Sequence, residues 1–431
     1  MKMQLCPLYK NAITCPDQIG LITKEKSWSY EELNEMVNHL CLYLNSQGIC
    51  ENARVAFIAT PHVATILLFC ALWRLKAIAC PLSTKIPKEQ IKPHLRRLKT
   101  VHFIDPTKIS LEMSKSSDSP FIDLDALATF LFTSGSSGVP KIACHTFGNH
   151  YYNALGALDA LQLDSSSRYL LSLPLFHVSG ISILFRTWLC GGTLVLDSVE
   201  SMKKYAITHL SLVPTQLYRL LQNKEECVPP GSLRCLLLGG APAAKQLLDL
   251  STALKWPVFT TYGMTETSSM MTLGKILPFR EIQIRDAEIY VRGKTLFQGY
   301  WDSEQEMVIN ATQEGWFATR DLGRFNAQGE LEIIGRKDRQ FISGGENIQP
   351  EEIERALCTL PGIIAAHVRS VEDPEFGKRP IAFVEDSTGL YILEKVRESL
   401  KPLLPAFKHP VQLLPLTSES DSKSFKISIL T

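Results

Sequence analysis

Short apolar runs alternate with longer helical patterns along much of the chain. After Ser29, apolar residues recur at helical spacing from Leu33 to Leu44, and Ser29 forms an S-x-x-E capping pattern with Glu32, which predicts an amphipathic helix. Apolar runs that predict buried strands lie at RVAFIA (54–59), AIACPL (77–82), VHFID (101–105), ATFLFTS (128–134) and CLLLGG (235–240), with a helix predicted through ATILLFCALWRL. This alternation predicts a layered α/β fold.

The pattern changes near residues 335–338. A helix is predicted to start at Pro350, followed by strand-like IIAAHV and IAFVE and by another helix near 392–404, which together indicate a compact α+β unit. A chain of 431 residues also exceeds what one hydrophobic core normally serves. We therefore expect two domains, 1–335 and 336–431.

Composition and charge narrow the classes of function and location. The chain has 45 basic and 44 acidic residues, a formal charge of +1, which gives no reason to expect nucleic acid or an anionic membrane as a partner. Its 11 cysteines are scattered without a C-x-x-C pair, so neither a disulfide framework nor a zinc site is indicated, and a reducing cytoplasm is expected. Residues 1–20 lack a continuous apolar core, so no export is predicted, and the apolar run 63–82 carries Arg74 and Lys76, so no membrane span is predicted.

The stretch TSGSSGVPK, residues 133–141, has two opposite interpretations, a slack linker or a phosphate-binding loop. The apolar ATFLF precedes it and IACHTFGNHYY follows it, so it leaves a predicted buried strand and is not flanked by polar linker sequence. Its spacing is not the Walker pattern. Backbone N–H groups at glycines, hydroxyls and one lysine can nevertheless hold polyphosphate, and the candidates are Thr133, Ser134, Gly135, Ser136, Ser137, Gly138 and Lys141.

Further motifs follow this loop in a fixed order: PLFHVSG (174–180), LLLGGAPA (236–243), TYGMTETS (261–268), GWFATRDLGRF (315–325) and GRKDRQFISGGENIQPEEIE (335–354). With them, the chain resembles the adenylate-forming superfamily of acyl-CoA synthetases, luciferases and peptide-synthetase adenylation domains from residue 28 to the C-terminus. The resemblance implies a large N-terminal layered α/β domain that binds ATP and the acid, and a small mobile α+β C-terminal domain. It also implies formation of an acyl-adenylate from ATP and transfer of the acyl group to a thiol, with Mg²⁺ and CoA as cofactor and co-substrate.

The resemblance assigns roles to residues of the ATP site. Glu266 matches the magnesium-binding carboxylate, although a lone glutamate on a loop is more often a solvated side chain. Tyr262 is expected to stack on adenine opposite Gly239, Gly240 and Ala241. Thr265 is expected to contact the α-phosphate beside Gly263, and Asp321 to bind the ribose hydroxyls with the help of Arg336.

The resemblance also assigns roles to residues for the transfer of the acyl group to the thiol and to a lysine near the C-terminus. Asp338 falls at the family's hinge position, and Ser343, Gly344, Gly345 and Glu346 resemble the loop that lines the pantetheine tunnel, although a glycine pair also suits a plain turn. The catalytic lysine of the family is assigned to Lys426 in preference to Lys423, because Ile427 follows Lys426 as in Gly-Lys-Ile. Phe425 stands where the family has glycine.

TFGNHYYNALGA and PLFHVSGISILFR resemble the o-succinylbenzoate-CoA ligases of menaquinone biosynthesis. The resemblance implies that His177 lines the acyl site and that Arg186, nine residues later on a predicted helix, meets the free carboxylate of the substrate. A lone histidine is more often structural and an arginine more often packs at a surface. The alternatives that stay open are another aryl- or fatty-acyl-CoA ligase, an enzyme loading a carrier protein, or a nucleotide-binding pseudoenzyme. The oligomeric state is open, with a homodimer as one option.

Overall fold

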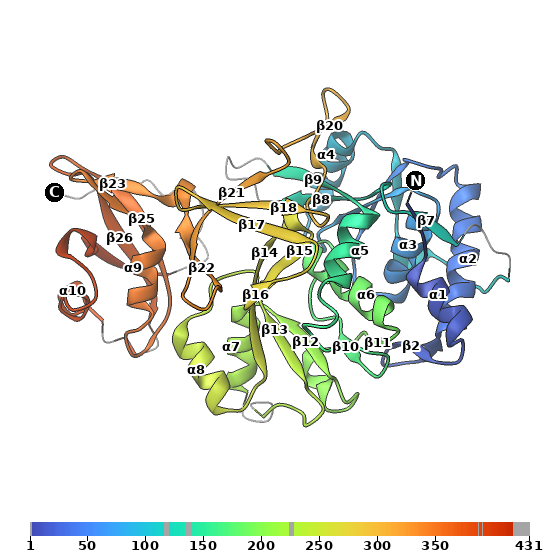
Figure 1. Cartoon of the computed structure of the whole chain (residues 1–431), viewed down its shortest axis with the longest axis horizontal. Coiled ribbons are helices and arrows are strands. Elements are labelled where there is room, and N and C mark those ends of the chain that lie inside the picture. Colours follow the sequence, from blue (N-terminus) through green and yellow to red (C-terminus); the bar gives the residue numbers. More distant parts are fainter. Residues whose placement is uncertain are drawn as a thin grey trace. The chain divides into compact units, whose positions relative to one another are not determined.

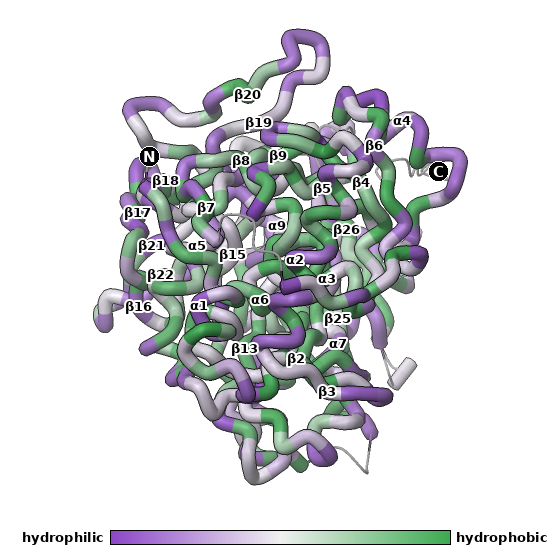
Figure 2. Tube along the Cα trace, turned by 90° about the vertical axis from the view of Figure 1, so that its right-hand side faces the viewer, coloured by the Kyte–Doolittle hydropathy of each residue, from purple (hydrophilic) through white to green (hydrophobic). Residues whose placement is uncertain are grey.

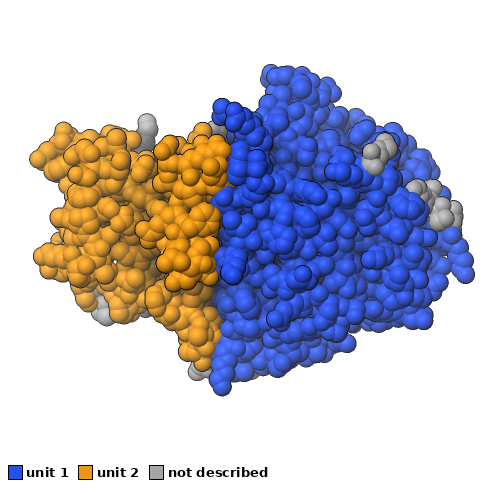
Figure 3. Space-filling view, in the orientation of Figure 1, with its two compact units in different colours: residues 1–241, 254–282, 291–317 blue, residues 242–253, 283–290, 318–431 orange. Residues whose placement is uncertain are grey.

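The computed structural model describes residues 2–115, 120–133, 140–223, 228–386, 388–389 and 391–416. These residues form two compact units, which Figure 3 colours separately: unit 1 comprises 1–241, 254–282 and 291–317, and unit 2 comprises 242–253, 283–290 and 318–431. The expected layered α/β architecture followed by an α+β region is confirmed. The domain boundary predicted at 335/336 lies within unit 2 and stays a prediction.

Unit 1 contains two large sheets (Figure 1). The first has the order β20-β19-β9-β8-β5-β4-β6, formed by Met307–Ile309, Gly299–Asp302, Lys141–Thr146, Leu127–Thr133, Ile78–Leu82, Arg54–Ile58 and His102–Ile104. The second has the order β16-β15-β14-β13-β12-β10-β11-β2-β3, formed by Lys275–Ile276, Ser269–Leu273, Val258–Met264, Cys235–Leu238, His209–Leu212, Arg168–Leu170, Thr193–Val195, Ile19–Ile22 and Ser27–Ser29. A small pair joins β1 (Met3–Leu5) to β7 (Phe121–Asp123).

Helices of unit 1 join the two sheets into one core. They are α1 (Pro7–Thr14), α2 (Tyr30–Ser46), α3 (Val63–Arg74), α4 (Lys88–Leu98), α5 (Phe147–Leu155), α6 (Val178–Cys190) and α7 (Pro214–Gln222). The capping box predicted at Ser29 and Glu32 begins α2, and its apolar stripe is buried. Helix α3 is buried at every position, as expected for a helix that is apolar on all sides. No described helix is long and apolar enough to span a membrane.

The first sheet is buried on both faces, which explains why its strands read as continuous apolar runs. In β4, Val55 and Phe57 belong to the core shared with the helices, whereas Ala56 packs on the opposite face with Phe130 and Ile142. The tube is correspondingly green along β4 and β5 (Figure 2). Strands β4, β5 and β8 pair in parallel, so their carboxyl ends meet at one edge of the sheet.

Unit 2 holds smaller sheets and helices. Most of a four-stranded sheet in the order β17-β18-β21-β22 lies in it, formed by Arg280–Arg285, Glu288–Gly293, Phe317–Phe325 and Leu331–Arg336. The hairpin β23-β24 (Phe341–Ser343, Glu346–Ile348) and the sheet β25-β26-β27 (Ile363–Asp373, Gly377–Asp386, Gln412–Pro415) follow. Its helices are α8 (Lys245–Ala253), α9 (Pro350–Leu357) and α10 (Leu393–Leu400), and α10 ends four residues before the predicted limit.

Candidate active site

The two ends of the predicted phosphate loop lie opposite each other in one antiparallel pair. Thr133 ends β8, Lys141 begins β9, and the two residues are register partners. A strand end at the edge of a buried sheet is where α/β proteins bind ligands. The structure therefore confirms that the stretch follows a buried strand. A linker between domains would not need to follow one. Ser134, Gly135, Ser136, Ser137 and Gly138 lie outside the described residues.

Glu266 lies in a tight turn between β14 and β15. The short 3-10 helix Thr265–Thr267 carries it, and its side chain is buried. Gly263 precedes the turn at a position where a Cβ atom would lie 2.1 Å from the carbonyl oxygen of Ser269, so only glycine fits there. Ser268 and Ser269 have φ values of 57° and 106°, which strain non-glycine backbone. The turn is thus held in a conformation that its own residues do not favour.

Tyr300 is a residue of this site that the sequence analysis missed. Its hydroxyl donates a 2.7 Å hydrogen bond to Oε1 of Glu266, and Nζ of Lys141 lies 4.6 Å from the centre of its ring. Tyr300 comes from β19, which pairs with β9 beside Lys141. One aromatic side chain therefore connects the lysine of the phosphate loop with the candidate magnesium ligand. The GYW sequence of this strand gave no signal for that contact.

Glu266 suits a magnesium site in which most of the ligands are phosphate oxygens and waters. One of its oxygens accepts the Tyr300 hydrogen bond, and the described residues contain no group of three or more His, Cys, Asp or Glu side chains placed to hold a metal. Mg²⁺ bound with a nucleotide takes one or two carboxylates, phosphate oxygens and waters, so a single glutamate meets its needs.

The residues predicted to enclose adenine come from two neighbouring parallel strands. Tyr262 lies in β14, and Gly239, Gly240 and Ala241 follow β13; Leu238 and Thr260 are register partners in the pairing. A Cβ atom on Gly239 would lie 2.7 Å from Cγ2 of Thr261. The structure therefore brings the tyrosine and the glycine segment to the same edge of the second sheet.

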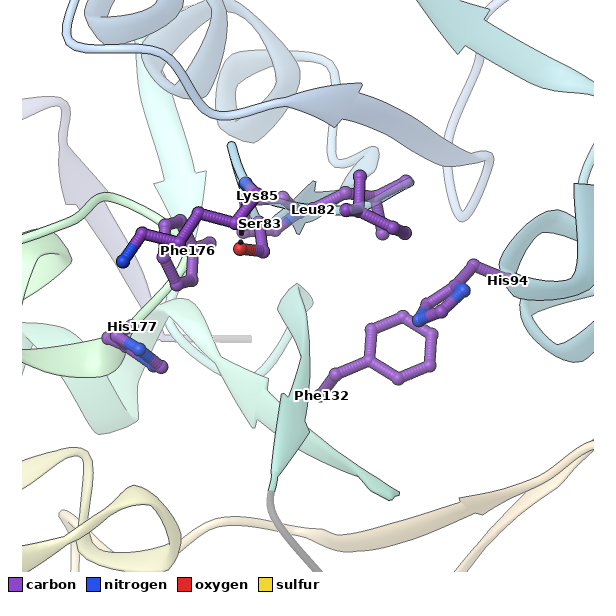
Figure 4. Close-up of a pocket in the computed structure, with 9 residues that line it drawn as sticks. Leu82, Ser83, Lys85, His94, Phe132, Phe176 and His177 are labelled. Carbon is purple, nitrogen blue, oxygen red and sulfur yellow. Dashed lines mark hydrogen bonds between the residues drawn. The ribbon is translucent and has the colours of Figure 1, made fainter. Parts of the chain in front are cut away.

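His177 lies at a cavity of about 390 Å³ in unit 1. It is the N-cap residue of α6, and burial lowers its pKa, which favours the neutral imidazole. Figure 4 shows Lys85 and His177 towards one end of the cavity and the rings of His94 and Phe132 towards the other. Phe132 is the penultimate residue of β8, so the cavity adjoins the start of the phosphate loop.

Arg186 is fully buried on α6, 1% exposed, and is among the largest side chains with no access to solvent. Its Nε and Nη2 atoms have no hydrogen-bond partner among the described residues. Arg280, buried nearby, is different: it donates to the carbonyls of Met270, Pro278 and Asn153 at 2.9, 2.6 and 2.8 Å. Burial and the charge of Arg186 lower the pKa of Arg280 to about 9. Arg186 is therefore a buried cation with unused donors.

Asp321 and Arg336 are brought together within unit 2. They are register partners on β21 and β22, and Nη1 of Arg336 lies 3.0 Å from Oδ1 of Asp321. The guanidinium also donates to both oxygens of Asp338, at 3.1 and 3.2 Å. Burial opposes the positive charge of Arg336, but the hydrogen bonds and charges of Asp338 and Asp321 outweigh it and raise its pKa. The predicted ribose pair and the predicted hinge residue thus share one arginine.

Asp338 lies between two anchored arginines. Arg336 is tied to β21, whereas Arg339 donates to Glu351 and Glu354 of α9, at 3.0 and 2.6 Å, and to the carbonyl of Val368 in β25. Asp338 itself is exposed. A residue between two firmly held segments is well placed to absorb a change of backbone angles.

Gly344 and Gly345 form the two-residue turn of the β23-β24 hairpin. Their φ values are 57° and 86°, and two successive positive φ values are typical of a type I′ turn, which accounts for the glycine pair. Ser343, 2% exposed, has a hydroxyl with no hydrogen-bond partner among the described residues. The tunnel assignment of this hairpin, including Glu346, stays a prediction. Lys423 and Lys426 lie outside the described residues.

A model of the AMP-binding enzyme family matches residues 8–301. The chain belongs to this family. Among its relatives, the 2-succinylbenzoate–CoA ligase of Escherichia coli (strain K12) is 32% identical over 96% of this chain and 94% of the relative. That of Salmonella typhimurium (strain LT2) is 35% identical over 93% and 91%. These alignments extend beyond the matched segment and include most of unit 2.

Solved structures of the family agree with the fold. The o-succinylbenzoate coenzyme A synthetase of Bacillus subtilis in complex with ATP and magnesium ion superimposes with a TM-score of 0.86, at 30% identity over 96% of each chain. The same Bacillus enzyme in complex with its acyl-adenylate intermediate gives a TM-score of 0.86 at 29% identity, over 96% of this chain and 95% of that one. The superfamily resemblance inferred from the motifs is therefore confirmed.

Proposed function

We propose that this protein is an AMP-forming 2-succinylbenzoate–CoA ligase. The succinyl carboxylate attacks the α-phosphorus of ATP, so that a C–O–P linkage forms, the α–β phosphoanhydride bond breaks and pyrophosphate leaves. The thiol sulfur of CoA then attacks the acyl carbonyl, AMP leaves, and the thiol proton passes to solvent. The similarity to 2-succinylbenzoate–CoA ligases over more than nine-tenths of the chain supports both steps.

The single observation that carries the substrate is Arg186. Leaving buried guanidinium donors without acceptors is unfavourable. Its Nε and Nη2 donors have no partner among the described residues, although Arg280 shows that the same region can satisfy a buried guanidinium with carbonyl groups. An acid whose second carboxylate stays free would supply the missing acceptors, as 2-succinylbenzoate does.

The nucleotide is proposed to bind with its triphosphate at the loop between Thr133 and Lys141. Carboxylate and triphosphate repel each other, so catalysis depends on charge neutralisation and alignment. Lys141 supplies a cation at the end of the loop, Glu266 would hold Mg²⁺, and Thr265 contacts the α-phosphate. Bound Mg²⁺ would neutralise phosphate charge.

The remaining roles complete the proposal. Tyr262 stacks on adenine against residues 239–241, and Asp321 binds the ribose with Arg336. Lys426 stabilises the adenylation step, and Asp338 is the hinge about which residues 336–431 turn to bring the hairpin at Ser343 to CoA. His177 forms a wall of the acyl site. We place the enzyme in the cytoplasm, where CoA and ATP are available to it.

ATP–pyrophosphate exchange across a panel of acids tests the function. Purified protein is expected to exchange with 2-succinylbenzoate and to form its CoA thioester, with benzoate and medium-chain fatty acids at least ~100-fold poorer in kcat/KM, because a site with a buried cation discriminates against acids that leave it unpaired. Equal exchange with benzoate or a fatty acid would reject the substrate assignment. No exchange with any acid would reject the enzymatic function.

A further inference from the structure

The turn that carries Glu266 is held by hydrogen bonds to most of its backbone carbonyls. Thr267 Oγ1 donates its one proton to the carbonyl of Ser269, at 2.7 Å, and the backbone N–H of Phe297 donates to that of Glu266. The side-chain amide of Asn153 donates to the carbonyls of Thr267 and Met270, at 3.1 and 3.0 Å. The carbonyl of Thr265 accepts from Ser268 N–H and from one further side chain, His145.

His145 reaches the turn from the strand that begins with Lys141. It lies four residues after that lysine in β9, is fully buried, and its Nε2 lies 2.7 Å from the carbonyl oxygen of Thr265. A carbonyl can only accept, so Nε2 carries the proton. Burial lowers the pKa of His145 to about 4, which leaves the ring neutral with an unprotonated Nδ1. The contact is thus a hydrogen bond between neutral groups across 120 residues of sequence.

Burial of the imidazole of His145 does not by itself favour the folded state. Ile142, Ala143 and Cys144 precede it in β9 and are buried, and Nδ1 of His145 has no hydrogen-bond partner among the described residues. A buried polar atom without a partner destabilises the fold, and an apolar side chain would avoid this. The bond that offsets the burial is the one to Thr265, the residue next to Glu266.

We propose that His145 is a positioning residue that holds the Thr265–Glu266 turn in the conformation required for the ATP-dependent step. It acts through the backbone of Thr265 and touches no substrate. Because the turn contains residues with unfavourable positive φ values, it needs external donors to keep its shape. This inference rests on the proposed role of Glu266 as the magnesium ligand.

His150 provides a matched control. It is as deeply buried as His145, its ring centre lies 5.0 Å from that of His145, and its pKa is also lowered by burial. Its Nε2 lies 2.8 Å from the hydroxyl of Thr129, however, and no described hydrogen bond joins it to residues 264–270. Replacing His150 therefore disturbs the packing around His145 without removing a donor to the turn.

The experiment compares His145→Leu, His145→Gln and His150→Leu in ATP–pyrophosphate exchange as a function of Mg²⁺ concentration, together with thermal unfolding. We expect His145→Leu to lower kcat and to raise the Mg²⁺ concentration for half-maximal rate, each by roughly 10- to 100-fold, as for other residues that orient a metal ligand. His145→Gln places an N–H donor near the position of Nε2 and is expected to restore both values to within about threefold. His150→Leu is expected to lower thermal stability only.

Two outcomes overturn the proposal. The first is His145→Leu with the same kcat and Mg²⁺ dependence as His150→Leu, since the histidine would then serve packing alone. The second is failure of His145→Gln to recover activity although it is folded. If His145→Leu does not fold, the kcat and Mg²⁺ dependence of His145→Gln decide whether the proposal holds. Failure of the proposed function is distinguishable, because it would show in the wild-type protein as exchange that does not require 2-succinylbenzoate or does not occur.

Discussion

The turn at Glu266 and the segment 336–339 both carry residues assigned to ATP-dependent chemistry, but different forces hold them. The turn is buried, and neutral donors such as His145 and Asn153 bind its carbonyls. The segment is largely exposed, and charged side chains hold it through ion pairs of 2.6 to 3.1 Å. The first arrangement fixes the backbone of the turn itself, whereas the second holds the side chains on either side of Asp338 and leaves the backbone between them without such bonds.

This difference suits the two roles proposed for these regions. A magnesium ligand must be in place before ATP arrives, so a preorganised turn serves it. A hinge must allow two conformations, so it needs anchored neighbours and a free backbone in between. Arg336 and Arg339 supply the anchors on either side of Asp338.

The largest effect is expected when the backbone of the segment 336–339 is made rigid at Asp338. Asp338→Pro fixes φ at this residue. The rate of thioester formation should fall ~100-fold, because the conformation for that step needs a different backbone angle, whereas the rate of adenylation should change only a few-fold. Single-turnover measurements of adenylate formation and of its transfer to CoA separate the two steps.

Asp338→Ala is the control for that change, because it removes the ion pair with Arg336 but leaves φ unrestrained. Both rates should stay within about fivefold of the wild-type values. Equal losses in the two steps of the proline variant would contradict a hinge at this residue.

The next effect concerns the charged anchor in α9. Burial by itself raises the pKa of Glu354, but hydrogen bonds from His367 and Arg339 and the charge of Arg339 outweigh it and lower the pKa to about 2 from its ordinary 4.5. The ionised carboxylate therefore stabilises the fold fully above pH 4.5, and this contribution disappears as the pH falls towards 2. Glu354→Gln should reduce the free energy of unfolding by about 2 kcal/mol at pH 7.

Urea unfolding of both proteins between pH 7 and pH 3 measures this effect, and the difference between them should shrink below pH 4.5. Glu352→Gln is the matched control on the same helix, since the Glu352 side chain is 38% exposed where it pairs with Lys408. It should change the free energy of unfolding by less than about 1 kcal/mol. A pH-independent difference for Glu354→Gln would exclude its charge as the cause.

The smallest effect is expected at Tyr300, which bonds the side chain of Glu266 and not the backbone of the turn. Tyr300→Phe removes one hydrogen bond to Glu266 but keeps the ring beneath Lys141 and beside Phe297. Because other bonds still hold the turn, the Mg²⁺ concentration for half-maximal rate should rise only about 3- to 10-fold, with thermal stability unchanged. A loss above ~100-fold in kcat would mean that Tyr300 takes part in the reaction directly.

Much of the architecture could be predicted from the sequence, because local signals and the final fold agree. The capping box at Ser29, the strand predicted at 128–134, which covers 127–133, and the helix carrying Arg186 all appear. The motifs also gave the family, since their order along the chain is specific. The hairpin turn at Gly344 accounts for the glycine pair as a plain turn. A turn can also line a tunnel, so the tunnel assignment stays a prediction.

The contacts that shape the site could not be predicted in the same way. Tyr300 and His145 meet residues 34 and 120 positions away, and the acceptor of His145 is a backbone carbonyl, which leaves no mark on the sequence. Residues 242–253 and 283–290 group with the C-terminal part of the chain for the same reason. Long-range pairing of this kind depends on the folded topology and not on local propensity.

The most direct test of the account compares two acids that differ by one carboxylate. 2-Succinylbenzoate and 4-oxo-4-phenylbutanoate share the succinyl chain and ketone, but only the first has the ring carboxylate proposed to meet Arg186. For the wild-type protein, kcat/KM in ATP–pyrophosphate exchange should favour 2-succinylbenzoate by ~100-fold or more, and in Arg186→Gln this preference should fall to less than about tenfold. An unchanged preference in a folded Arg186→Gln variant would contradict the account.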